Sequence, residues 1–134
     1  MNDLNKRAPA AIAAVAGSVA LMLCLPAVAH HSTAMFDFAK TVEVKGTIKE
    51  FQWTNPHIWI QISVPNAKGG VEDWSVEGDS PNLVSRQGWQ RNSFKTGDKV
   101  VIKVHPMRSG EPGGSFMTAT FPDGRTLGTP GPQY

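Results

Sequence analysis

The sequence predicts an all-β protein: a small five-stranded barrel of the OB type, with one short helix between the third and fourth strands. Apolar and polar residues alternate with a period of two over short segments that end at Gly, Pro, Asn or Asp, as in antiparallel strands. Three such segments, a helical segment and two further segments follow one another, which is the order of elements in an OB-fold. A fragment of a β-sandwich is the main alternative.

Length and composition narrow the class of protein. The chain has 134 residues, which allows one domain and excludes a multidomain enzyme or a (β/α)₈ barrel. Its 13 basic and 11 acidic residues give a net charge of +2, too small for the basic face that nucleic acid requires. The single Cys allows no internal disulfide and no Cys-based metal cluster.

Residues 1–29 have the pattern of a secretory signal peptide. Two basic residues precede an apolar run that ends at Leu25, and Ala27 and Ala29 supply the small side chains that signal peptidase requires. We therefore expect cleavage before His30, and a mature periplasmic or secreted protein of 105 residues without Cys. We expect no stable membrane insertion after cleavage. An uncleaved anchor is the alternative, which the many Ala residues of this weakly hydrophobic run disfavour.

The first strand is predicted over residues 41–49, where apolar side chains alternate with Thr, Glu and Lys. Gly46 lies in its middle and suits the bend that a long strand needs to turn the corner of a small barrel. The Thr-Asn-Pro sequence at 54–56 ends the strand, because Pro cannot donate to a ladder interior.

The second and third strands are predicted over residues 57–62 and 71–77, joined by a Gly-rich turn. Three Ile residues of the second strand share one face, while His57 and Trp59 lie on the other. On the third strand Trp74 has the inward period, so we expect it in the core. The outer face of this hairpin is therefore polar and carries one Trp.

A short helix follows the third strand. Ser80 is a suitable N-cap, Pro81 a suitable first helical residue, and Gly88 a stop signal. We expect Trp89, directly after that Gly, to pack the helix end onto the barrel. This length suits a plug for the barrel rather than a crossover connection.

Two more strands complete the predicted barrel. The fourth, over residues 100–105, alternates three inward apolar residues with Val101, Lys103 and His105. A Gly- and Pro-rich loop leads to the fifth, over residues 115–121. The predicted domain spans residues 30–127, and residues 128–134 form a flexible Gly/Pro tail.

The histidines locate a candidate site on this barrel. In an OB-fold, the loops between strands one and two and between strands four and five border the ligand face on strands two and three. His57 opens the second strand and His105 closes the fourth, so we expect both at the same rim. Face-matched pairing about the turn sets three pairs opposite each other: His57 with Glu77, Trp59 with Ser75, and Gln61 with Asp73. A His–carboxylate pair is thus predicted at the edge of the ligand face.

One hypothesis is a transition-metal site, with copper as the expected metal. A free amine followed by the imidazole of His30 would chelate Cu(II), and cleavage one residue earlier would place His31 third in the chain, another copper or nickel arrangement. The candidate ligands are His30, His31, His57, Glu77 and His105. The alternative is structural: His57 caps a turn, His105 is a solvated strand end, and the two N-terminal His belong to a tail.

The second hypothesis is a module that binds a small ligand or another exported protein, with purely structural His residues. Its candidate contacts are Trp53, Asn55, His57 and Trp59. Trp59 faces outward, where OB-folds stack ligands, unless Met35, Phe36 and Phe38 of the N-terminal segment cover it.

Signals of an enzyme are sparse. The sequence has no Gly-x-Ser-x-Gly elbow, no Gly-rich phosphate loop with Lys and no Cys nucleophile. A hydrolase with His57 as base and Glu77 as its orienter is the catalytic interpretation that stays open. The sequence favours a binding protein without catalytic activity.

Three stretches of the sequence also resemble a known protein family. They are the His-His-Ser start at 30–32 with Phe36-Asp37, the Trp-Thr-Asn-Pro-His-Ile-Trp segment at 53–59, and Pro81-Asn82 with Gly88-Trp89 ahead of Gly97-Asp98. In these the chain resembles a family of short secreted bacterial proteins of unknown function, over nearly all of residues 30–127. The resemblance implies an exported small β-domain and supplies no active site.

Overall fold

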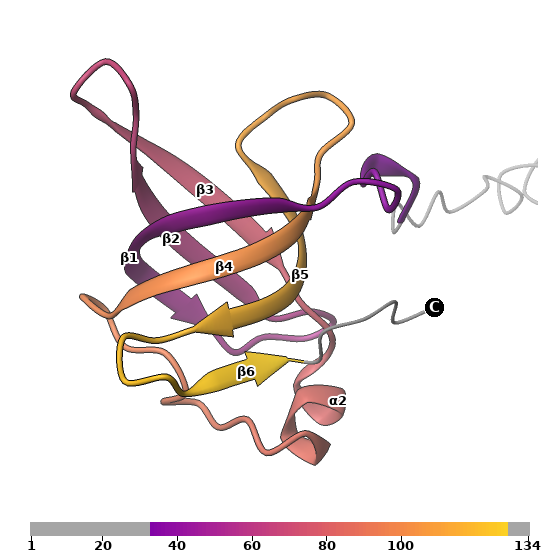
Figure 1. The fold of residues 1–134 in the computed structure, drawn as a ribbon. Helices are drawn as coiled ribbons and strands as arrows, with labels where there is room; N and C mark the ends of the chain where they lie inside the picture. Colours follow the sequence, from indigo (N-terminus) through magenta and orange to yellow (C-terminus); the bar gives the residue numbers. More distant parts are fainter. Residues whose placement is uncertain (1–32, 129–134) are drawn as a thin grey trace, which may run out of the picture. The chain divides into compact units, whose positions relative to one another are not determined.

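The computed structural model describes residues 33–128. A 3₁₀ turn, η1 (Thr33–Met35), comes first, and a short helix, α2 (Pro81–Arg86), separates the third and fourth strands (Figure 1). The strands are β1 (Val42–Gln52), β2 (Trp59–Pro65), β3 (Val71–Glu77), β4 (Lys99–Pro106), β5 (Gly113–Thr120) and β6 (Thr126–Gly128). In this part of the chain no helix is long and apolar enough to cross a membrane.

The five strands β1 to β5 form a closed barrel. The sheet order is β3-β2-β1-β4-β5 with antiparallel neighbours, and a parallel pairing of β3 with β5 closes the ring. β6 adds an antiparallel strand to β5. The predicted all-β barrel with one short helix between strands three and four is confirmed, and its closure excludes the alternative of a sandwich fragment.

The barrel interior is filled by the apolar side of the predicted alternation. Side chains that share the inward period on β2 and β4 are buried, and so are those that face them from the other strands. The most buried large side chains are Ile48, Ile58, Ile60, Ile62, Val76, Ile102 and Val104. This core fixes the outer face of β2 and β3, because a slip by one residue would exchange the two faces.

β1 changes partners near its middle, where it turns the corner of the barrel. Its first half pairs with β4 and its second half with β2, and Thr47 pairs with both Lys99 and Ser63. At Gly46 a Cβ would lie 2.5 Å from the carbonyl oxygen of Ser63 and 2.7 Å from Cγ2 of Ile62. Glycine is therefore required here for close approach of β2, while the bulge itself lies slightly later, between Ile48 and Glu50.

The helix is built as its sequence predicts. The hydroxyl of Ser80 accepts a hydrogen bond from the Leu83 amide at 3.4 Å, and Pro81 is the first helical residue. Gly88 has a φ of +87°, which glycine adopts without strain, and the chain then enters the core at Trp89. The ring of Trp89 packs edge-on against Phe94 and Phe116, which attaches the helix to the barrel.

The predicted pairing of β2 with β3 is wrong by two residues. Trp59 lies opposite Glu77 and Gln61 opposite Ser75. The turn holds five residues, since Asn66 donates from its backbone N–H to the Gly70 carbonyl and accepts from the Gly70 amide through its side chain. An even shift keeps every side chain on its predicted face.

The ends of the elements differ from the prediction in two places. β1 continues beyond the alternating residues 41–49 to Gln52, shortly before the Thr-Asn-Pro sequence expected to end it. β6 was not expected, and it includes Gly128, which the sequence assigned to the tail. A three-residue strand between turns has too few alternating positions to be recognised from sequence. The rest of that tail lies outside the described residues.

Candidate ligand-binding site

The predicted His–carboxylate pair forms just before β2, between His57 and Glu77 at the end of β3. Nδ1 of His57 is hydrogen-bonded to Oε1 of Glu77, with 35% of the His side chain and 13% of the Glu side chain exposed. The backbone beneath is held by two bonds, from the Thr54 hydroxyl to the His57 carbonyl and from the Ile58 amide to the Asp79 carbonyl, both 3.0 Å. A carboxylate acceptor assigns the proton to Nδ1, which leaves the lone pair of a neutral ring on Nε2.

Beside this pair the outer face of β2, β3 and β5 is hollowed by a cavity of about 300 Å³. Its walls come from the outward residues of β2 and β3, the start of β5, the N-terminal segment and the β4–β5 loop. They are Met35, Phe36, Trp59, Ser75, Glu77, Met107, Glu111, Pro112, Gly113 and Gly114. The lining is mainly apolar and aromatic, and its ionisable members are two carboxylic acids. This is the arrangement of a small-molecule site: apolar walls with a few polar groups.

The N-terminal segment is fixed as one wall by backbone pairing with the β4–β5 loop. Phe36 and Met107 form an isolated antiparallel bridge, the Asp37 amide donates to the Pro106 carbonyl at 2.8 Å, and the Arg108 amide donates to the Met35 carbonyl at 2.9 Å. Two alternatives were open for Trp59: an outward ring free to stack a ligand, or a ring covered by the N-terminal segment. The structure combines them. Met35 and Phe36 face the same space as the indole, and a cavity remains between them.

The pairings place His105 in the same row of the sheet as the partner of His57. Trp59 pairs with Glu77, Glu77 with Ser115, and Ser115 with His105, so these four residues lie side by side on β2, β3, β5 and β4. A rim shared by both loops and both histidines stays a prediction. In Figure 1 the β4–β5 loop and the β2–β3 turn are both at the top of the view, and α2 is at the bottom. His105 bonds through Nδ1 to the Lys40 carbonyl at 2.8 Å, and its ring lies 5.1 Å from that of Phe38.

The other predicted ligand contacts, Trp53 and Asn55, do not line the cavity. Trp53 packs against Phe51 and has the Arg91 guanidinium 5.9 Å from its ring centre. Asn55 is exposed and precedes Pro56 through a cis peptide. Of the residues named for ligand contact, Trp59 therefore lines the cavity. His57 is hydrogen-bonded to Glu77, which also lines it.

The predicted metal ligands are only partly brought together. His57 and Glu77 touch, while across residues 33–128 no three His, Cys, Asp or Glu side chains are grouped to hold an ion. His30 and His31 lie outside the described residues. A site that uses those two residues stays a prediction.

Two carboxylates near the cavity have their charge stabilised by lysines. A hydrogen bond from Lys49 lowers the pKa of Asp73 below its ordinary value of 3.8, and a weaker bond from Ser63 adds to this. Lys40 likewise lowers the pKa of Asp37. Both pairs are at the surface, so they set the local charge more than the stability of the fold.

Sequence reasoning missed the part of the site that the β4–β5 loop supplies. Met107, Glu111 and Gly113 line the cavity, and none was a candidate. The Gly/Pro richness of this loop was its one signal, and it says nothing about which strand the loop approaches. The parallel pairing of Ser75 with Gly113 brings the loop over β3.

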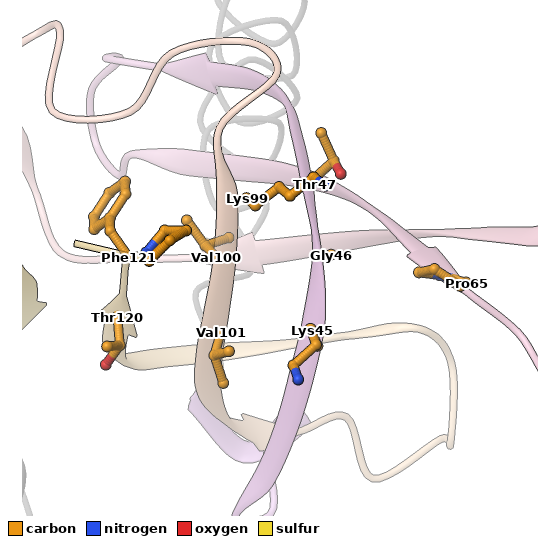
Figure 2. A pocket seen from close by; sticks show the side chains of 10 residues that line it. Lys45, Gly46, Thr47, Pro65, Lys99, Val100, Val101, Thr120 and Phe121 are labelled. Atoms are coloured by element: carbon orange, nitrogen blue, oxygen red, sulfur yellow. The ribbon is translucent and has the colours of Figure 1, made fainter. Parts of the chain in front are cut away.

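A larger hollow of about 540 Å³ lies elsewhere, on the outside of β1 and β4. Figure 2 shows its lining side chains on β1, on β4, at the end of β2 and at the end of β5. Lys45 and Lys99 are its charged residues, and Val101 lies in its wall. It contains none of the predicted site residues and no acidic side chain, so the cavity at Trp59 is the better candidate.

The fold and the cavity define a class: a small closed OB-type barrel with a hollow on the outer face of β2, β3 and β5. A model of a family of unknown function, DUF6152, matches residues 18–116, and the chain belongs to this family. The resemblance stated from the motifs is thereby confirmed as far as a family of unknown function. No curated protein matches the chain, and no solved structure does.

Proposed function

We propose that the protein is an exported binding module that takes a small ligand in the cavity beside Trp59. The observation that carries this proposal is the position of the cavity. It opens on the outer face of β2 and β3, where OB-folds hold their ligands, and it joins an indole to the carboxylate of Glu77. Apolar walls provide affinity, and the carboxylate gives the ligand an orientation.

The His57–Glu77 pair supports this role in a further way. With Nδ1 engaged by Glu77, the imidazole is held in one orientation and the carboxylate is anchored toward the cavity wall. Preorganised polar groups reduce the ordering cost of binding. The role of His57 in this pair is therefore to hold the Glu77 carboxylate in position.

Metal handling through imidazoles is the second candidate function. Histidines that bind metals usually donate their other ring N–H to a carboxylate, and His57 has this arrangement with Glu77. Its remaining ligands would come from His30 and His31 at the new N-terminus. Metal analysis of the processed protein, without chelator, tests this candidate.

The ligand-binding proposal is tested by NMR on the chain that begins at His30. A fragment library is added, and the indole N–H signal of Trp59 and the amides of Ser75 and Gly113 are followed. We expect the hits to shift these three signals and to leave the buried indole of Trp89 unchanged. Hits that instead shift Val101 and Thr120 would assign binding to the larger hollow and overturn the proposal.

Export is tested separately. The full chain is produced in a bacterial host, and the intact mass of the protein in the periplasmic fraction is measured. We expect a species that begins at His30, and we expect Ala29→Arg to block its formation, because signal peptidase needs a small residue there. A protein that keeps residues 1–29 in the wild type would contradict export by cleavage.

A further inference from the structure

The cavity beside Trp59 combines aromatic rings with negative charge. Trp59 of β2 and Phe36 of the N-terminal segment both line it, and so do the carboxylic acids Glu77 and Glu111. Among residues 33–128, no Lys or Arg belongs to the lining. Aromatic faces and carboxylates both attract a cation, and carboxylates repel an anion. The lining therefore favours a ligand that carries a positive charge.

The register of the sheet places the indole and one carboxylate side by side. Trp59 and Glu77 are directly opposite each other in the antiparallel pairing of β2 with β3, so their Cβ atoms lie about 5 Å apart on the outer face. A cation interacts with an indole when it lies within about 6 Å of the ring centre. One small charged group can therefore contact both side chains at once.

Glu77 carries its charge in a sheltered position. Only 13% of its side chain is exposed, and its Oε1 is hydrogen-bonded to Nδ1 of His57. A neutral imidazole that donates to the carboxylate leaves the negative charge in place. Arg108, on the β4–β5 loop, donates from Nε to the Ala34 carbonyl at 3.1 Å and does not line the cavity. Because charges interact more strongly where water is excluded, Glu77 attracts a cation in the cavity more than an exposed carboxylate would.

The polar groups of the lining already have partners within the protein, and this selects the kind of cation. The Ser75 hydroxyl accepts from Nε2 of Gln61 at 3.0 Å, and Oε2 of Glu111 accepts from the Ser109 hydroxyl at 3.0 Å. A primary ammonium has three N–H donors, which need acceptors once they leave water. A quaternary ammonium has no N–H donor and presents methyl groups to apolar walls, so it suits this lining better.

We propose that the cavity binds a small quaternary ammonium ligand, with its charged head over the indole of Trp59 and against the carboxylate of Glu77. The inference rests on the proposed function, because it assigns the ligand class of the same cavity. The volume of about 300 Å³ is at the lower end of the range for ligand pockets, so the ligand is a short molecule.

The test compares three probes of similar shape and different charge. Choline has a trimethylammonium head, its uncharged analogue has a tert-butyl group in place of that head, and tert-butylacetate is an anion. Each is titrated at constant ionic strength into the chain from His30, and the indole N–H of Trp59 and the amides of Ser75 and Gly113 are followed by NMR. We expect choline to shift these signals, to leave the Val101 amide in place, and to bind about tenfold more tightly than the uncharged analogue. The anion should bind beside Trp59 more weakly still.

Two variants separate charge from structure. Glu77→Gln keeps the size of the side chain and an acceptor for His57 while it removes the charge. We expect it to weaken choline binding by about tenfold and to change the affinity for the uncharged analogue by less than about twofold, with circular dichroism unchanged. Glu43→Gln is the matched control and should keep both affinities, because Glu43 lies opposite Lys103 and does not line the cavity. An equal loss of both probes in Glu77→Gln would overturn the role of its charge.

Two further outcomes would contradict the proposal while the proposed function stands. If the uncharged analogue binds as tightly as choline, the cavity takes neutral apolar ligands, and only the assignment of a cation fails. If library fragments bind beside Trp59 while choline leaves its indole signal in place, the cavity takes another class of ligand. If neither the fragments nor the three probes shift these signals, the proposed function fails as well.

Discussion

Replacing Gly46 by Ala should destabilise the barrel at the point where β1 passes from β4 to β2. The new Cβ would lie 2.5 Å from the Ser63 carbonyl oxygen and 2.7 Å from Cγ2 of Ile62, a side chain with no exposed surface. Neither neighbour moves cheaply, so overpacking costs about 1–3 kcal/mol. The reduced chain entropy of Ala returns about 0.5–1 kcal/mol. The middle of these ranges gives a net loss of about 1 kcal/mol, or a melting temperature lower by about 4–8 °C.

Urea unfolding of the chain from His30, followed by Trp fluorescence, measures this loss. Gly70→Ala is the matched control, because the Cβ there meets only the flexible Asn66 side chain, at 3.3 Å, and the backbone is not in the left-handed region. We expect that control to stay within about 0.5 kcal/mol of the wild type. A Gly46→Ala protein as stable as the control would refute the close approach of β1 and β2, and with it the partner exchange that closes the barrel.

Two further predictions concern the core and the surface charges. Ile60→Ala should lower the free energy of unfolding by about 2–5 kcal/mol in the same assay, because Ile60 is fully buried opposite Val76. A loss below about 1 kcal/mol would contradict the inward position of Ile60. Because the pKa of Asp73 is lowered in the folded state, the Lys49 contact stabilises the fold above pH 3.8 and is lost as the pH falls through the folded value. Lys49→Met should therefore raise the carboxyl pKa of Asp73 toward 3.8 in a ¹³C NMR titration and flatten the acid dependence of stability; an unchanged titration would show that the contact is absent.

The fold could be predicted because its determinants are local and periodic. Alternation placed the Ile residues of β2 inside, and the Ser80-Pro81 pair with Gly88 set the helix. The strand order then followed from the sequence of elements. The register of the hairpin could not be predicted, because it depends on how Asn66 closes the turn, and a two-residue shift leaves every face unchanged.

The part of the site on β2 and β3 was predicted from the sequence, and the part that the β4–β5 loop supplies was missed. Trp59 and Glu77 share an outer face that period-two alternation identifies, and their strands are adjacent in the chain. Met107 and Glu111 reach the cavity only through the pairing of β5 with β3, two strands that are far apart in sequence. His105 reaches the neighbourhood of Glu77 through Ser115, which pairs with both residues.

The central claim is that the cavity beside Trp59 is the ligand site. Native mass spectrometry of the exported protein, purified gently and without chelator, tests it most directly. We predict one bound small molecule in the wild type and in Val101→Ala, whose side chain lines the larger hollow, and its loss in Trp59→Ala, whose indole lines the cavity. A ligand that the Trp59→Ala variant retains, or a bare polypeptide in every sample, would contradict the account.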